Sequence, residues 1–149
     1  MRKRNKSTRT KTTSAGGVIY ADINKERFIL LLKREDGYWV LPKGHQKEDE
    51  LLLATTIYRE IFEEAGLVAQ DLLIENQLGI FMDNSFPEED KTVHLYAIRY
   101  TGVSLPPIII DEAHVEAKWW STLKPLPKLK YSYQNIAIVK FVSQSHSEK

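Results

Sequence analysis

One segment of the chain, residues 49–65, has the spacing of an amphipathic helix, and it constrains the fold more than any other. Its apolar residues include steps of i, i+3, i+4 and i+7 and are Leu51, Leu52, Ala54, Ile57, Tyr58, Ile61, Phe62 and Ala65. No Gly or Pro interrupts the segment, and Gly66 follows where helices commonly stop. The pattern predicts one long helix that ends at Gly66.

Short apolar runs on both sides of this segment predict strands. They are residues 15–21, 27–33 and 38–41 before it, and 71–82, 92–101 and 115–120 after it. Turn-prone residues 22–25 indicate a β-hairpin, and an acidic loop, 83–91, is expected to be exposed. Residues 132–142 fit a strand or a helix; Ser132 as N-cap and the apolar spacing favour a helix. Strands around one long helix indicate an α+β or α/β sandwich.

The charge of the chain is unevenly distributed. Its 149 residues carry a formal net charge of +1, but six of the 21 basic residues lie in 1–13, where no acid occurs, which leaves 15 against 20 acids. Residues 1–13 lack apolar periodicity and are expected to be a disordered basic tail, with order beginning near Ala15. Residues 14–149 are predicted to form a single domain, long enough to bury a sizeable core.

Composition excludes several functional classes. The chain has no cysteine, so disulfides, thiolate metal sites and cysteine nucleophiles are excluded. No apolar run approaches the roughly 18 residues of a membrane span, and no secretory signal follows the basic start. We expect a soluble, cytoplasmic protein with no membrane partner; the oligomeric state stays open.

Three carboxylates lie near the end of the predicted helix. Glu60, Glu63 and Glu64 stand at i, i+3 and i+4, so they share one helix face within roughly 6 Å of one another. They repel one another at the negative end of the helix dipole unless a cation neutralises them. Carboxylate oxygens suit Mg²⁺ or Mn²⁺, and Mg²⁺ sites often add phosphate oxygens of a substrate. A solvated acidic helix face is the alternative.

The surrounding motif resembles that of a known family. The motif is similar to the Nudix box: it consists of Gly44, five further residues, Glu50, eight further residues and then residues 59–67 (REIFEEAGL). Residues 15–20 (AGGVIY) also look like this family. The resemblance implies an α/β/α sandwich with a central mixed sheet, the box loop and helix, and a C-terminal helix. It also implies hydrolysis of a nucleoside diphosphate linked to another moiety.

The resemblance assigns roles to individual residues. It implies that Mg²⁺, or Mn²⁺, is held by Glu60, Glu63 and Glu64 together with the Gly44 carbonyl. One glutamate would assist the attacking water, and Arg59 would pair with a box glutamate. Some members use a base outside the box, for which Glu116 is the first candidate here and Glu112 the second, although each could be an ordinary surface acid.

The box departs from the family pattern by one extra residue between Glu50 and Arg59. In an unbroken helix, nine steps of 100° place these two residues on opposite faces. If Glu50 supports Arg59 or the metal, the extra residue must be absorbed in the loop or in a bulge. Otherwise Glu50 is an acid stabilised by the N-terminal helix dipole.

Residues 38–45 (YWVLPKGH) point to one class of substrate. They are similar to the entry to the box in asymmetric diadenosine polyphosphate hydrolases, which implies that Lys43 and His45 touch the phosphate chain. Otherwise both are ordinary surface residues. The adenine of such a substrate needs an aromatic platform, because stacking contributes about 1–3 kcal/mol per base. The candidate platforms are Phe81, Phe86, Tyr96 and Tyr131. The downstream tyrosine that often marks this subgroup is not evident.

Other functions remain open. Within the same fold, the alternatives are an RNA 5′-pyrophosphohydrolase and a nucleoside triphosphate or nucleotide-sugar pyrophosphatase. A catalytically silent Nudix module that binds RNA or a nucleotide is the rival from another class, with the basic tail supplying affinity for RNA. The three glutamates favour an enzyme, because a pure binding module has no physical reason to keep them on one face.

Overall fold

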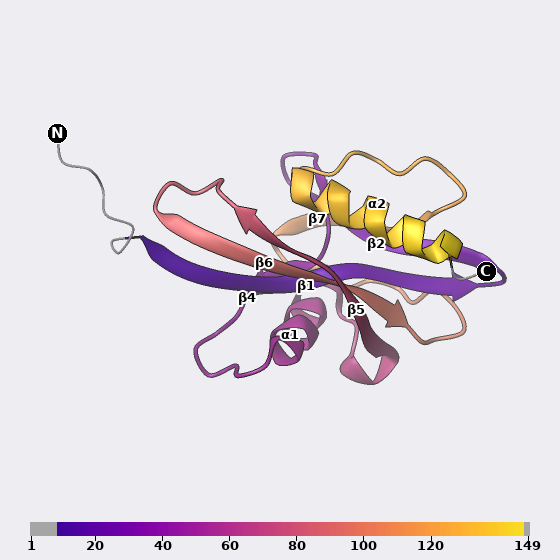
Figure 1. Ribbon diagram of the computed structural model, residues 1–149. Coiled ribbons are helices and arrows are strands. Elements are labelled where there is room, and N and C mark those ends of the chain that lie inside the picture. The colour runs from indigo at the N-terminus through magenta and orange to yellow at the C-terminus, as the bar shows by residue number, and fades with distance from the viewer. Residues whose placement is uncertain (1–8, 148–149) are drawn as a thin grey trace.

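A mixed β-sheet with one helix against each face forms the fold (Figure 1). The structure is a computed structural model and describes residues 9–147. Its strands are β1 (Thr10–Ile23), β2 (Glu26–Arg34), β3 (Trp39–Val40), β4 (Lys43–His45), β5 (Leu72–Asp83), β6 (Glu89–Tyr100) and β7 (His114–Ser121). Its helices are α1 (Leu53–Ala65), α2 (Ser132–Ser147) and a short 3₁₀ turn, η2 (Ala69–Asp71).

The order of the strands explains how the two faces are covered. The main path is β3-β2-β1-β6-β5, with β4 paired to β1 and β7 paired to β2. β1 and β6 run parallel and the other pairs are antiparallel, which makes the sheet mixed. Successive residues of β1, such as Val18 and Ile19, point into different cores, one under α2 and one over α1. The predicted α+β sandwich is confirmed.

The predicted hairpin is confirmed by the pairing of β1 with β2 and by the geometry of the turn between them. β1 and β2 pair from Tyr20–Ile29 to Ile23–Glu26. Asn24 and Lys25, which connect them, have φ angles of 51° and 66°. Two consecutive positive φ values are typical of the turns that match the twist of paired strands.

The long helix ends where predicted but begins later. Gly66 has a φ of 72°, and its N–H donates to the Phe62 carbonyl at 2.9 Å, which ends α1. The first turn is at Leu53, and Leu51 and Leu52 are 90% and 67% exposed. Extending the helix to residue 49 was therefore wrong: the apolar spacing continued into a loop whose leucines do not pack.

Order at the N-terminus begins earlier than predicted. Residues 1–8 of the expected tail lie outside the described residues, but β1 already begins at Thr10 and pairs in parallel with β6. Arg9 holds this end: its guanidinium bonds to the Asp90 carboxylate at 2.7 Å and to the carbonyls of Pro87 and Glu89. The prediction of disorder was therefore wrong for residues 9–13, because pairing with β6 supplies the contacts their own sequence lacks.

The acidic loop is shorter than predicted, and α2 is confirmed. β5 and β6 extend into residues 83–91, and Asp83 pairs with Lys91 in the strand register. Both side chains are buried, so only residues 84–88 connect the strands. The helical interpretation of residues 132–142 is confirmed, with Ser132 as the first helical residue rather than the cap.

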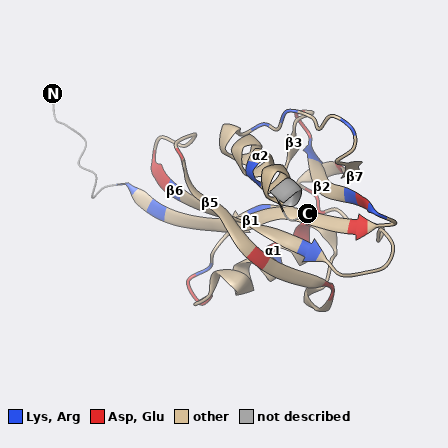
Figure 2. Cartoon of the chain, turned by 45° about the vertical axis from the view of Figure 1, so that its right-hand side comes forward, with Lys and Arg blue, Asp and Glu red and all other residues tan. Residues whose placement is uncertain are grey.

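Charged residues of both signs are spread over the strands and loops of the described chain (Figure 2). No helix within residues 9–147 is long and apolar enough to cross a membrane.

Candidate functional site

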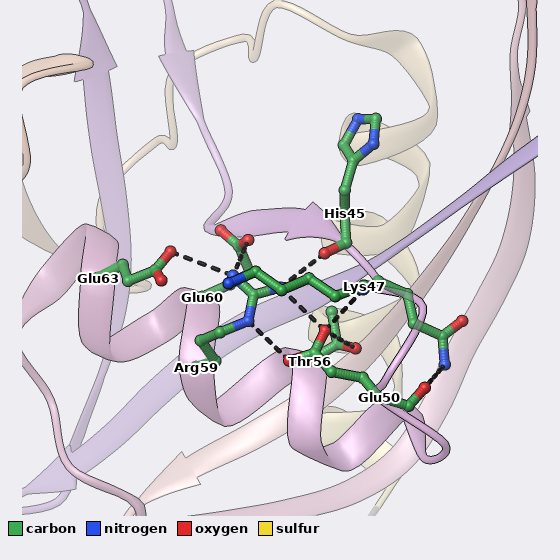
Figure 3. A network of polar contacts seen from close by, with 8 residues as sticks. His45, Lys47, Glu50, Thr56, Arg59, Glu60 and Glu63 are labelled. Atoms are coloured by element: carbon green, nitrogen blue, oxygen red, sulfur yellow. Dashed lines mark hydrogen bonds and ion pairs between the residues drawn. The ribbon is translucent and has the colours of Figure 1, made fainter.

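Arg59 is the centre of a polar network at the start of the candidate site (Figure 3). Its guanidinium donates to both carboxylate oxygens of Glu50, at 2.7 and 3.0 Å. A third group, the carbonyl of His45, accepts from Nη2 at 2.7 Å. The remaining nitrogen, Nη1, contacts Glu60 at 2.6 Å and Glu63 at 3.2 Å. Arg59 thus ties β4, the box loop and α1 together.

Glu50 lies in the loop before α1, and this placement absorbs the extra residue of the box. Its Oε1 accepts from the backbone N–H of Lys47 and from the hydroxyl of Thr56. Contact with Arg59, the Lys47 amide and Thr56 lowers the pKa of Glu50 to about 2. Of the two roles predicted for Glu50, the structure shows the first, in which Glu50 supports Arg59.

Gly44 brings the backbone of β4 against the carboxylate of Glu60. A Cβ at Gly44 would overlap the Glu60 side chain, so only glycine permits this approach. Gly44 pairs with Ala15 of β1, which fixes its position in the sheet. Gly44 and Glu60, both predicted to surround a metal, are therefore in contact.

Glu64 is nearly buried, unlike the half-exposed Glu63. Burial is the main cause that raises the pKa of Glu64, and hydrogen bonding to Glu60 together with the charge of Asp111 raises it further. A buried carboxylate beside another is a donor set that a hard cation would stabilise. As their side chains stand, no three acidic or imidazole groups of residues 9–147 converge enough to hold a metal. Arg59 forms ion pairs with Glu60 and Glu63 in this arrangement.

A cavity of about 230 Å³ opens beside Glu64. Lys43 lines it from β4, Tyr131 from the segment before α2, and Gln134 from the first turn of α2. Burial, together with the nearby charge of Lys91, lowers the pKa of Lys43. The predicted metal ligand Glu64 and the predicted phosphate contact Lys43 therefore share one cavity.

Tyr131 separates this cavity from a second one of about 570 Å³. Its ring stacks on Tyr133 at 5.5 Å, and the ammonium of Lys43 lies 5.6 Å from its centroid. The second cavity extends toward Lys128, Lys130 and the segment 82–85. Tyr131 is the only one of the four predicted aromatic platforms that lines either of these two cavities.

The remaining predicted aromatics lie elsewhere. Phe81 packs in the core under α2 and stacks on Tyr133 at 5.8 Å. Tyr96 packs in the core on the α1 side. Phe86 is exposed beyond the end of β5, with the Lys91 ammonium 4.6 Å from its ring. Phe81 and Tyr96 line neither of the two cavities, because the alternation of β5 and β6 directs them toward the two cores.

Three other predicted residues stand outside these two cavities. His45 lies on β4 and is largely exposed. Partial burial of its ring, together with the charge of Lys91, lowers the pKa of His45. Glu116 is exposed on β7 opposite Lys33, and Glu112 is exposed just before that strand. Neither predicted base lines the cavity beside Glu64.

Sequence reasoning missed three residues that do line this cavity, namely Arg34, Asp111 and His114. Arg34 ends β2 and donates to the Tyr131 hydroxyl at 3.3 Å. Nδ1 of His114 lies 2.6 Å from the carboxylate of Asp111. The spacing of a carboxylate and a histidine three residues apart at a strand start was the available signal.

The chain is similar in sequence and fold to several known proteins. MutT4 of Mycobacterium tuberculosis is 32% identical over 137 residues, which cover 85% of this chain and 54% of that protein. The RNA pyrophosphohydrolase of Bartonella tribocorum is 30% identical over 122 residues, which cover 71% of this chain and 69% of that protein. A crystal structure of a C. elegans Ap4A hydrolase matches the fold with a TM-score of 0.73 at 20% identity, covering 91% of this chain and 98% of that one.

The chain spans about half the length of MutT4, so it corresponds to part of that relative. The model of the NUDIX domain matches residues 10–138, which include every strand, α1 and the first turns of α2. The chain belongs to the NUDIX domain family.

Proposed function

We propose that this chain is a Mg²⁺-dependent hydrolase that cleaves a phosphoanhydride bond in a nucleoside diphosphate linked to another moiety. The buried carboxylate of Glu64, in contact with Glu60 and in one cavity with Lys43, carries the proposal. Mn²⁺ has the same preference for oxygen ligands and would serve as well. Glu60, Glu63, Glu64 and the backbone of Gly44 are the groups that would hold the ion.

The bound cation would supply charge neutralisation for the phosphate chain and activation of water. The chain's own residues provide the rest of the site. Lys43 and Arg34 line the cavity with positive charge, which suits phosphate oxygens. Arg59 forms ion pairs with Glu60 and Glu63, which fixes the orientation of these two carboxylates next to Glu64 on α1.

A dinucleoside polyphosphate of the diadenosine tetraphosphate type is our favoured substrate. Two cavities meet at Tyr131, which offers a stacking platform close to the phosphate-binding cations Lys43 and Arg34. The second cavity is large enough for further groups and is lined by Lys128 and Lys130. A substrate with a nucleoside at each end of a phosphate chain uses both spaces.

An RNA 5′-pyrophosphohydrolase is the second candidate. It is supported by the 30% identity to the relative of that name from Bartonella tribocorum. Basic residues in 1–8, which lie outside the described residues, would then add affinity for the RNA backbone, and activity would fall steeply with salt.

A panel assay with Mg²⁺ distinguishes these functions. It compares diadenosine polyphosphates, nucleoside triphosphates, nucleotide sugars and 5′-triphosphorylated RNA. We expect diadenosine tetraphosphate to have the highest kcat/KM. Preference for RNA would favour the second candidate, and turnover of none with nucleotide binding retained would identify a silent binding module.

A further inference from the structure

The structure offers a proton acceptor that the box motif does not contain. The two sequence-based candidates, Glu116 and Glu112, do not line the cavity beside Glu64, whereas Asp111 and His114 do. Both lie just before or at the start of β7, on the wall of the cavity that also contains Lys43.

The hydrogen bond between Asp111 and His114 orients the imidazole ring and favours one of its tautomers. Oδ1 of Asp111 lies 2.6 Å from Nδ1 of His114. A carboxylate oxygen accepts, so the contact favours the tautomer with the hydrogen on Nδ1, and in that tautomer Nε2 is an acceptor. Among the residues that the structure describes, none hydrogen-bonds to Nε2. This nitrogen is therefore available to a ligand or a water molecule.

Two backbone contacts hold the pair next to Glu64. The N–H of Ile109, two residues before Asp111, donates to the carbonyl of Ala65 at 3.1 Å. That contact joins the segment to the end of α1, one residue after Glu64. At the other end, His114 begins β7 opposite Arg34 of β2. The pair is therefore anchored to rigid elements on both sides, as a positioned catalytic group requires.

We propose that Nε2 of His114 is the general base of the hydrolysis and that Asp111 is its positioning residue; this rests on the proposed function. The water oxygen forms a bond to phosphorus, and the bridging P–O bond breaks. The electron pair of the broken bond leaves on the bridging oxygen of the departing phosphate. One proton of the water moves to Nε2, and the imidazolium then releases it to solvent.

Charged groups from three elements line the same cavity as His114. Arg34 from β2, Lys43 from β4 and Glu64 from α1 line the same cavity, together with the Tyr131 hydroxyl from the segment before α2. The carboxylate of Asp111 lies directly against the ring and compensates its positive charge when the proton arrives.

Kinetics of His114 variants test the assignment. We expect His114→Asn and His114→Ala to lower kcat about 100-fold, within the usual range for a general base, while KM changes less than about twofold. Added imidazole should restore part of the turnover of His114→Ala only. Asp111→Asn should lower kcat less than removal of the ring. His94→Asn is the matched control, because His94 bonds to Gln77 and does not line the cavity.

A second measurement does not depend on turnover. Nitrogen NMR of the metal-free wild-type chain should show the His114 ring protonated on Nδ1 and bare on Nε2, and Asp111→Asn should weaken this preference. Circular dichroism of each variant checks that it folds.

The outcomes separate the two proposals. An active wild type whose folded His114→Ala variant keeps its kcat and pH profile, or loses turnover without imidazole rescue, would overturn the role of His114 alone. A wild type that hydrolyses no member of the nucleotide panel would overturn the proposed function and this base with it.

Discussion

Arg59 donates two hydrogen bonds to the carboxylate of Glu50, from Nε at 2.7 Å and from Nη2 at 3.0 Å. The pair connects the loop before α1 to the middle of that helix, although the box contains an extra residue between them. Two-point contact fixes the orientation of the guanidinium as well as its distance. Nη1 is thereby directed to Glu60, which lies against Gly44.

This pair predicts a loss of stability in acid. The pKa of Glu50 is lowered from 4.5 to about 2 in the folded chain, so the unfolded chain binds more protons between these values. The contribution of Glu50 to the free energy of unfolding is complete above pH 4.5 and is lost as the pH falls toward 2. Urea denaturation between pH 7 and pH 3 should show a shallower acid dependence for Glu50→Gln. Glu48→Gln, an exposed neighbour in the same loop, is the control, and equal slopes for wild type and Glu50→Gln would refute the prediction.

Gly44→Ala should inactivate the site without unfolding the chain. Its Cβ would overlap the Glu60 carboxylate and displace it from the position that Arg59 maintains. We expect kcat to fall about 100-fold, as misplacement of a catalytic group by about 1 Å can cost this much. Gly37→Asn serves as the control, because Gly37 lies in open space and Asn tolerates its positive φ. An active Gly44→Ala enzyme would show that the approach of β4 to Glu60 is not required.

Tyr131→Leu should raise KM more than it lowers kcat. Loss of a stacked base costs about 1–3 kcal/mol, which corresponds to a rise in KM of about 5- to 150-fold. Tyr131→Phe keeps the ring and removes only the hydroxyl contact with Arg34, so its KM should stay close to that of the wild type. Steady-state kinetics with diadenosine tetraphosphate measures both. Equal effects of the two variants would mean that the hydroxyl, and not stacking, is what the substrate uses.

The box helix could be predicted from the sequence because its information is local. The apolar residues up to Ala65 follow the spacing of one helix face. Gly66 then ends the helix through a backbone conformation that glycine adopts readily. The start of the helix could not be predicted in the same way. Leu51 and Leu52 continue the apolar spacing, but they lie in a loop whose path is set by Glu50 reaching Arg59.

The cavity beside Glu64 depends on contacts between segments that are distant in the sequence. Lys43, Glu64 and Tyr131 come from β4, α1 and the segment before α2, and all three were named from the sequence. Asp111 and His114 were missed, because their spacing of three residues is a weak local signal. The contact of Ile109 with the end of α1, which brings them to Glu64, has no signature in the sequence. Phe81 and Tyr96 lie away from the two cavities of the site, because the strand register alone decides which core each one packs against.

Binding of Mn²⁺ and Mg²⁺-dependent turnover, measured on the wild type and on Glu64→Gln, test the central claim most directly. Electron paramagnetic resonance measures Mn²⁺ binding, and hydrolysis of diadenosine tetraphosphate is followed with Mg²⁺ or with EDTA. Glu35→Gln, an exposed glutamate in the β2–β3 turn, is the control. We expect no turnover in EDTA, weaker Mn²⁺ binding by Glu64→Gln and turnover reduced by more than about 100-fold, since even an outer-shell partner of a metal costs that much. Undiminished turnover of a folded Glu64→Gln variant, or turnover in EDTA, would contradict a metal-dependent site at Glu60, Glu63 and Glu64.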